Sequence, residues 1–182
     1  MNLPNLITLL RIFLIPVFIL VFLTPTQPRS LAAAIIFIIA SLTDLMDGYL
    51  ARRWKQITKL GKFLDPIADK FLVLAALIML VDFHRVSSWI AIVIIGRELA
   101  VTGLRAIASS SGIVIGADEA GKYKMAIQTV SIGLLILEYK IGFINFHAWG
   151  TFLLWISMIL AILSGIQYFI KFLTQIDPIE IK

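Results

Sequence analysis

The chain has 182 residues, of which 60% are hydrophobic and only 15% are charged, and its net charge is +5. About a quarter of the residues of a soluble domain are charged, so this composition excludes an ordinary soluble enzyme or binding module. The sequence has no cysteine, which excludes disulfides and thiolate chemistry. The composition predicts a protein that spans a bilayer.

Six apolar runs fit membrane helices, which need about 20 mostly apolar residues to cross about 30 Å of hydrocarbon. They cover residues 3–23, 31–50, 67–82, 88–108, 124–142 and 148–173. Almost no extramembrane mass is left, so we expect a single membrane domain over residues 1–182. The predicted fold is all-α, a polytopic membrane protein with six transmembrane helices.

The first run reads as a retained helix, because it has no basic n-region and no cleavage site of the A-x-A type. Its polar residues Asn5, Thr8 and Arg11 recur every three positions and form one stripe. Two interpretations are open. The helix is interfacial with a snorkelling arginine, or the stripe faces a polar cavity.

Basic residues gather in alternate connections between the runs. The second and fourth connections contain Arg52, Arg53, Lys55, Lys59, Lys62, Arg105, Lys122 and Lys124, whereas the others contain only Arg29, Arg85 and Lys140. The positive-inside rule then places both termini and both basic connections in the cytoplasm, on the inner side of the cytoplasmic membrane. Anionic lipids and phosphorylated substrates lie on that side, and we expect no nucleic-acid partner.

Four aspartates lie at the facing ends of the second and third runs, namely Asp44, Asp47, Asp65 and Asp69. On a helix, the first pair shares a face with Gly48 and Ala51, at spacings of three, four and seven. The second pair steps by four from Gly61. Carboxylates beside residues with almost no side chain indicate that a bulky, charged ligand lies along this face.

The third run also has a helix-start pattern, in which Pro66 fits the first turn and Asp65 fits the cap. A structural interpretation of the aspartates as caps and surface carboxylates is therefore open. It suits Asp65 better than it suits all four, because each intramembrane carboxylate costs around 3 kcal/mol.

Carboxylates in close quarters repel one another and raise their own pKa values unless cations neutralise them. Hard oxygen donors without cysteine or clustered histidine suit Mg²⁺ or Mn²⁺ rather than zinc. Two such ions can clamp a pyrophosphate and stabilise an in-line displacement. A cation-transport site is the alternative from another functional class, but it has no evident need for the neighbouring small residues.

The pattern Asp44-x2-Asp47-Gly48-x2-Ala51-Arg52-x8-Gly61-x3-Asp65-x3-Asp69 resembles the full signature of the CDP-alcohol phosphotransferase family. The resemblance implies a homodimeric six-helix membrane enzyme that binds two divalent cations and displaces CMP from a CDP-linked substrate with an alcohol. It implies that the first three aspartates are the principal metal ligands. Asp69 would be the general base and a further metal ligand.

The resemblance also implies a site for the cytidine diphosphate. The small residues Gly48, Ala51 and Gly61 would make room for it, with Arg52 nearby. We expect Asn5 and Thr8 of the polar stripe to belong to the same site.

Four longer stretches narrow the resemblance within the family: "NLPNLITLLRIFLIPVF", "FLDPIADK", "GRELAVTGLR" and "GKYK". They are similar to bacterial members that transfer a phosphatidyl group from CDP-diacylglycerol to glycerol 3-phosphate. Met125, after "GKYK", stands where a threonine is expected, so no hydroxyl contact is predicted there. Inositol phosphate and phosphatidylglycerol remain alternative acceptors.

The fourth and fifth runs suit an anionic acceptor. Glu98, Thr102 and Arg105 share one helix face, and Lys124, Gln128 and Ser131 share another, so Lys124 should point inward. A planar donor fork suits a phosphate. We predict that the acceptor phosphate is bound by Arg105, Lys124, Lys122 and Arg97. Lys122, two positions before Lys124, lies on the far side of the helix unless it precedes it, so geometry favours Lys124. A structural alternative pairs Glu98 with Arg105 or another basic residue to make its burial tolerable.

Overall fold

The computed structural model describes residues 3–54, 59–110, 119–141 and 144–180. Side chains are described within 6–43, 70–110, 123–139 and 145–175, together with Ala68 and Gly121. The elements are α1 (Leu3–Phe22), α2 (Gln27–Trp54), α3 (Lys59–Asp82), α4 (Ser88–Ser110), α5 (Glu119–Leu137), β1 (Lys140–Ile141), β2 (Ile144–Asn145) and α6 (Phe146–Glu180). The predicted all-α fold is confirmed over these ranges, apart from the two-residue antiparallel strands.

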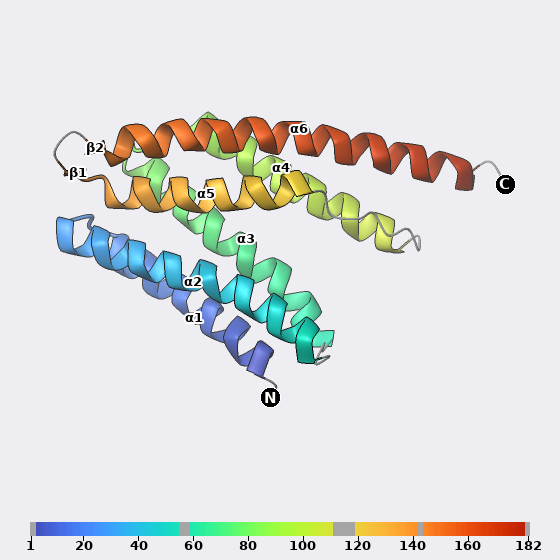
Figure 1. Cartoon of the computed structure of the whole chain (residues 1–182), viewed down its shortest axis with the longest axis horizontal. Helices are drawn as coiled ribbons and strands as arrows, with labels where there is room; N and C mark the ends of the chain where they lie inside the picture. The colour runs from blue at the N-terminus through green and yellow to red at the C-terminus, as the bar shows by residue number, and fades with distance from the viewer. Residues whose placement is uncertain (1–2, 55–58, 111–118, 142–143, 181–182) are drawn as a thin grey trace.

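The six helices run up and down (Figure 1). α1, α3 and α5 begin, and α2, α4 and α6 end, towards the same end of the molecule. We call it the aspartate end, because the last turns of α2 and the first turns of α3, which contain the four aspartates, lie there. The opposite, hairpin end holds β1 and β2. This alternation is the one that the positive-inside argument requires.

α3 packs against α1 and α2 on one side and against α4 and α5 on the other. α6 packs chiefly on α5 and also on α4. The α1–α2 pair diverges from the α5–α6 pair towards the aspartate end (Figure 1). α3 thus contacts helices of both halves of the molecule.

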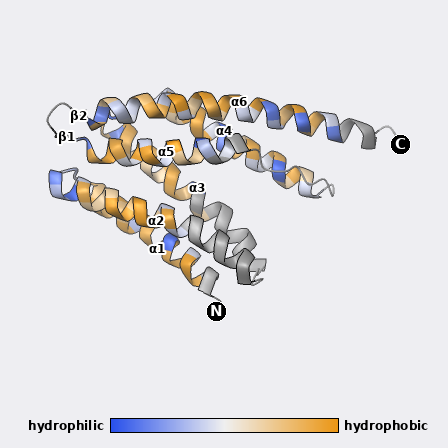
Figure 2. Cartoon of the chain, viewed as in Figure 1, coloured by the Kyte–Doolittle hydropathy of each residue, from blue (hydrophilic) through white to orange (hydrophobic). Residues whose placement is uncertain are grey.

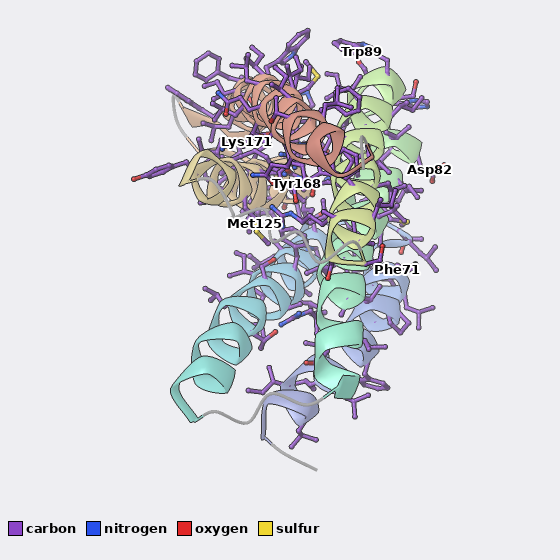
Figure 3. All side chains as sticks on the ribbon, turned by 90° about the vertical axis from the view of Figure 1, so that its right-hand side faces the viewer. Phe71, Asp82, Trp89, Met125, Tyr168 and Lys171 are labelled. Carbon is purple, nitrogen blue, oxygen red and sulfur yellow. The ribbon has the colours of Figure 1, made fainter. Side chains whose placement is uncertain are left out.

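The core is apolar, and so is much of the outside. Phe18 and Phe37 join α1 to α2 with ring centroids 6.1 Å apart, and both side chains are fully buried. Phe13, Leu20 and Ile92 are about two-thirds exposed. Apolar residues predominate along most of the described helices (Figure 2), and many side chains point away from the bundle (Figure 3). Helices of this kind are suited to an apolar solvent on the outside as well as to packing inside.

One helical stretch, Phe146–Gln175, is both long and apolar enough to cross a membrane within the described residues. Three shorter apolar helical stretches are Leu6–Phe22, Gln27–Thr43 and Tyr123–Leu137. The six helices are thus present, whereas six transmembrane spans remain a prediction.

Several predicted boundaries were wrong, mostly because hydrogen-bonded helix continues past an apolar run; α6 extends to Glu180, and α5 is displaced, running from Glu119 to Leu137 instead of over 124–142. α2 extends to Trp54 through charged residues, instead of ending at residue 50. α3 begins at Lys59 instead of near residue 67, so Asp65 lies inside the helix and is not its N-cap. Both helices reach beyond the apolar segment into the basic connection.

Arg85 closes the hairpin end of α5. Its Nη1 donates to the Leu135 and Ile136 carbonyls at 3.1 and 2.7 Å, and its Nη2 lies 2.7 Å from the Glu138 carboxylate. Glu138 has a φ of 49°, a left-handed conformation that commonly ends a helix. Burial lowers the pKa of the Arg85 guanidinium, and Glu138 opposes that shift. The arginine satisfies carbonyls that the last helical turn leaves without partners.

Candidate functional site

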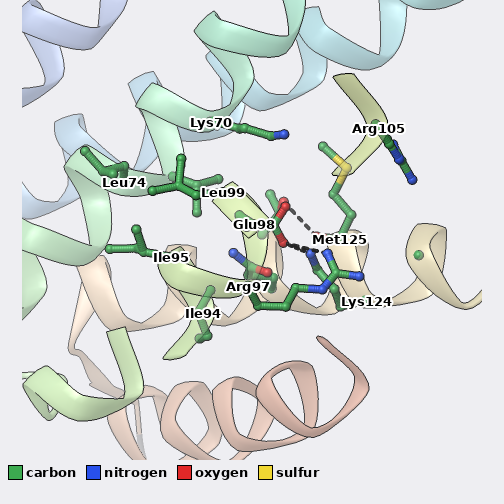
Figure 4. A pocket seen from close by; sticks show the side chains of 14 residues that line it. Lys70, Leu74, Ile94, Ile95, Arg97, Glu98, Leu99, Arg105, Lys124 and Met125 are labelled. Carbon is green, nitrogen blue, oxygen red and sulfur yellow. Dashed lines mark hydrogen bonds and ion pairs between the residues drawn. The ribbon is translucent and has the colours of Figure 1, made fainter. Parts of the chain in front are cut away.

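A cavity of about 280 Å³ lies between α3, α4 and α5 (Figure 4). Apolar side chains from α3 and α4 form part of its wall, including Leu74, Ile94 and Leu99. Its polar lining comes from Lys70, Arg97, Glu98, Arg105, Lys124, Gln128 and Thr129. Four of these seven residues are cations and one is an anion, so the cavity suits a small anionic ligand. We call it the basic pocket.

The predicted inward face of α5 is confirmed. Lys124, Gln128 and Ser131 are all buried, with at most 4% of each residue exposed. Ser131 donates to the Gly150 carbonyl of α6 at 2.8 Å, while Lys124 reaches the basic pocket. The shared face therefore does two things, packing on α6 and supplying a buried cation.

Glu98 is paired, as the structural interpretation proposed. Its Oε1 accepts a hydrogen bond from Lys124 Nζ and another from Arg97 Nη1 at 3.2 Å. The partners are thus a residue on α5 and its own neighbour. The Glu98 carboxylate offsets part of the cost of taking the buried Lys124 charge out of water.

Arg97 lies at the pocket but is held largely by α6. Its Nε donates to the Ala161 carbonyl at 2.8 Å and its Nη2 to Ser164 Oγ at 2.6 Å. Gly165 makes space for it, since a Cβ there would lie 3.2 Å from Arg97 Cγ. With Nη1 on Glu98, three of its five N–H donors serve the protein. Arg97 is built to hold α4, α6 and Glu98 together.

Arg105 lines the same pocket near the aspartate end of α4. Its guanidinium carbon lies 5.2 Å from the centroid of the Tyr168 ring on α6, a cation–π distance. Stacking restricts the planar fork without using its in-plane N–H donors. The predicted group of Arg105, Lys124 and Arg97 is therefore brought together, and the Lys122 side chain lies outside the described residues.

Lys70 is a pocket residue that helix-face reasoning missed. It donates to Thr102 Oγ1 on α4, and Thr102 donates to the Glu98 carbonyl at 2.7 Å. Lys70 directly follows Asp69, so it is not on the helix face that Gly61, Asp65 and Asp69 share. The available signal was a lysine at the start of an apolar run, since ionisable residues in membrane helices are functional by default.

Met125 also lines the basic pocket, so the expected threonine position does face the site. Thr129, one turn later, lines it too and donates to the Met125 carbonyl at 3.0 Å. A hydroxyl is thus present one turn away from the expected place.

The predicted metal-binding and nucleotide-binding residues lie in stretches of α2 and α3 whose backbone is described but whose side chains are not. Asp44, Asp47, Gly48, Ala51 and Arg52 belong to α2, and Gly61, Asp65 and Asp69 belong to α3. The helical backbone confirms the premise of the spacing argument. Among the described side chains no group of three or more metal-ligand residues occurs, and these aspartates lie outside that set.

The polar stripe of α1 turns inward. Thr8 and Arg11 are 1% and 0% exposed, so the snorkelling interpretation of Arg11 is wrong. α1 packs on α2 and α3, the two helices that contain the aspartates. The Asn5 side chain lies outside the described part of the chain.

Comparison with known proteins gives one consistent family. A family model described as CDP-alcohol phosphatidyltransferase matches residues 1–163. The chain is 43% identical to a CDP-diacylglycerol–glycerol-3-phosphate 3-phosphatidyltransferase of Bacillus subtilis, over 93% of this chain and 94% of the relative. Proteins of the same name from Haemophilus influenzae and Escherichia coli K12 are 40% and 38% identical, each over 92% of this chain and 91% and 92% of the relative. The chain belongs to the CDP-alcohol phosphatidyltransferase family.

Proposed function

We propose that the chain transfers the phosphatidyl group of CDP-diacylglycerol to sn-glycerol 3-phosphate, releasing CMP. The observation that carries this proposal is the basic pocket, which sets Lys124, Arg105 and Lys70 beside the part of α3 that follows Asp69. Relatives that match over nearly the full chain have names that state these substrates.

The pocket argues for an acceptor that is small and anionic. Its volume lies below the roughly 300–1,000 Å³ of sites for drug-sized ligands. Arg105 offers a planar fork and Lys124 a compact point charge, two complementary ways to bind a phosphate. Arg97 would act indirectly, by holding Glu98 in place and by bonding to α6. Lys122 lies within α5 rather than before it, so helix spacing does not place it on the face of Lys124, and its role as a further phosphate ligand has the least support of the four.

The donor set of the aspartate end suits two divalent cations. Asp44, Asp47, Asp65 and Asp69 would supply only carboxylate oxygens, the ligands that Mg²⁺ and Mn²⁺ prefer. The helices that contain them, α2 and α3, pack against each other. When bound, the ions neutralise the pyrophosphate and the charge that develops on the leaving CMP.

Around this centre the chain would bind and position the two substrates. Asp69 accepts the proton of the acceptor's primary hydroxyl, whose oxygen attacks the β-phosphorus as the bond to CMP breaks. General-base help of this kind is worth roughly 10²–10⁴-fold. Gly48, Ala51 and Gly61 leave room for the cytidine diphosphate, and Arg52, Asn5 and Thr8 complete that site.

A membrane setting follows from the composition and from the exposed apolar side chains. We infer six transmembrane helices with both termini and the aspartate end in the cytoplasm. CDP-diacylglycerol would then enter sideways, with its acyl chains in lipid. The homodimer implied by the family resemblance remains a prediction.

Two other functions are separated from this one by experiment. Inositol phosphate would suit the same basic side chains of the pocket. Phosphatidylglycerol could place only its headgroup in a cavity of this size. A cation transporter would move ions without cleaving a nucleotide.

The deciding experiment uses the purified protein with CDP-diacylglycerol and Mg²⁺, and measures CMP release. We expect release with glycerol 3-phosphate and little release with glycerol, inositol phosphate or phosphatidylglycerol. Faster release with one of the last two would reassign the acceptor. No release with any alcohol, in a protein that carries Mg²⁺ across vesicles, would replace the enzyme by the transporter.

A further inference from the structure

Glu98 is an anion in a pocket otherwise built for an anionic ligand. It is the one acidic residue among the described residues that line the basic pocket. Its side chain is 23% exposed, whereas the Lys124 side chain beside it is 6% exposed. A carboxylate here weakens the attraction of the pocket for phosphate, so phosphate binding alone does not explain why Glu98 is there.

The carboxylate is held from two sides through one oxygen. Arg97 and Lys124 both donate to Oε1, and Arg97 is itself fixed to α6 through Ala161 and Ser164. Among the described side chains, no hydrogen bond or ion pair reaches Oε2. The position of Glu98 is therefore fixed while one oxygen keeps its capacity to accept (Figure 4).

An ionised carboxylate only accepts hydrogen bonds, so Oε2 cannot bind the phosphate of the acceptor. It can bind a hydroxyl. We propose that Glu98 Oε2 accepts a hydrogen bond from the secondary hydroxyl of the acceptor, and that Glu98 thereby selects a phosphorylated polyol over a phosphorylated simple alcohol. This inference rests on the proposed function and assigns its specificity to a named atom.

The charges of the pocket residues determine which part of the acceptor each one binds. Lys124 and Arg105 attract the phosphate, and Glu98 repels it. Because Lys124 is itself bonded to Glu98, the phosphate is drawn towards Arg105 and the secondary hydroxyl towards Glu98. The reacting primary hydroxyl is thereby oriented through its two neighbours on the three-carbon chain. Sites built to bind a hydroxyl strongly reject the analogue that lacks it, because their buried polar group loses its partner.

A purely structural Glu98 would behave differently. In that role it would only keep Lys124 in place, so its loss would weaken every phosphorylated acceptor alike. The two roles are separated by an acceptor that keeps the phosphate and the primary hydroxyl but lacks the secondary hydroxyl. 3-Hydroxypropyl phosphate is that compound.

The test measures kcat/KM for CMP release with glycerol 3-phosphate and with 3-hydroxypropyl phosphate. Wild type should prefer glycerol 3-phosphate by about 10- to 150-fold, the scale of one hydrogen bond to a charged group. Glu98→Gln should reduce this preference to about threefold or less, chiefly by losing activity with glycerol 3-phosphate. Binding of 3-hydroxypropyl phosphate, followed by calorimetry without the nucleotide, should be unchanged or tighter.

Ser164→Ala is the matched control, because it removes a partner of Arg97 and leaves the carboxylate in place. It should keep the preference of the wild type. An equal loss of activity with both acceptors in Glu98→Gln would overturn the inference. A wild-type enzyme that uses both acceptors equally well would also overturn it, without any variant. A wild type that uses neither acceptor would instead overturn the proposed function.

Discussion

Lys70 on α3 donates a hydrogen bond to the Thr102 hydroxyl on α4, which donates onward to the Glu98 carbonyl at 2.7 Å. This relay joins the helix that contains Asp65 and Asp69 to the helix that contains Glu98 and Arg105. Helices are stiff, so one such contact helps to fix the position of the acceptor pocket relative to the carboxylates.

The relay predicts an effect of Lys70 on the acceptor. Lys70→Met should lower kcat/KM for glycerol 3-phosphate by about 10- to 150-fold, since a hydrogen-bonding cation at the pocket is lost. Thr102→Val should cost less, about fivefold, because it removes the contact that positions Lys70 but leaves the cation at the pocket. Steady-state kinetics at saturating CDP-diacylglycerol measures both. Arg29→Met, at the hairpin end, should leave the kinetics unchanged; an equal loss there would point to a general effect of removing a basic residue.

Arg105 and Lys124 should act mainly on the acceptor. Arg105→Ala or Lys124→Ala should each lower kcat/KM for glycerol 3-phosphate by about 10- to 150-fold, because a charge-assisted hydrogen bond is lost. The KM for CDP-diacylglycerol should barely move, because its pyrophosphate is assigned to the aspartate end. If either variant weakened both substrates equally, the basic pocket would be a folding feature, and the choice of acceptor would rest on family resemblance.

Activity should depend on a divalent cation and on the aspartates. Excess chelator should abolish CMP release, and Mg²⁺ or Mn²⁺ should restore it. Asp44→Asn and Asp47→Asn should each be nearly inactive while inserting normally into membranes. Asp82→Asn, an exposed aspartate at the other end of α3, is the control and should keep full activity. Near-normal turnover of either Asn variant would favour the structural interpretation of the carboxylates.

Arg85 should matter for stability and little for chemistry. Arg85→Ala removes two hydrogen bonds to α5 carbonyls and leaves them without a partner, which should cost about 1.5–3 kcal/mol. Glu138→Gln should cost less than about 1 kcal/mol, because that carboxylate is substantially exposed. Thermal unfolding in detergent measures both. The kcat of the folded fraction should be unchanged, since Arg85 lies at the hairpin end; a fall in kcat at full stability would contradict this assignment.

The absence of cysteine allows a clean test of orientation. His84→Cys lies in the connection from α3 to α4, and Ser110→Cys at the end of α4. A membrane-impermeant maleimide should label the first in intact cells and the second only after the membrane is opened. The reverse pattern would place the aspartate end outside.

Much of this protein could be predicted from its sequence because the constraints are local. Apolar runs of bilayer length indicate six helices, and residues three and four apart on a helix must share a face. The inward direction of Lys124 followed from Gln128 and Ser131 in this way. The aspartate signature likewise rests on the spacing of residues within α2 and α3, which the helical backbone of both segments supports.

Tertiary packing decided what spacing within one helix cannot. Lys70 entered the pocket because α3 crosses α4 beside Thr102, and Arg97 was directed to α6 because Gly165 leaves room for its side chain. Helix ends could not be predicted from the apolar runs either. Backbone hydrogen bonds extend α2 beyond its apolar run to Trp54, and they start α3 at Lys59, before its apolar run begins. Periodicity determines which residues share a face, but only the packed neighbour determines what that face meets.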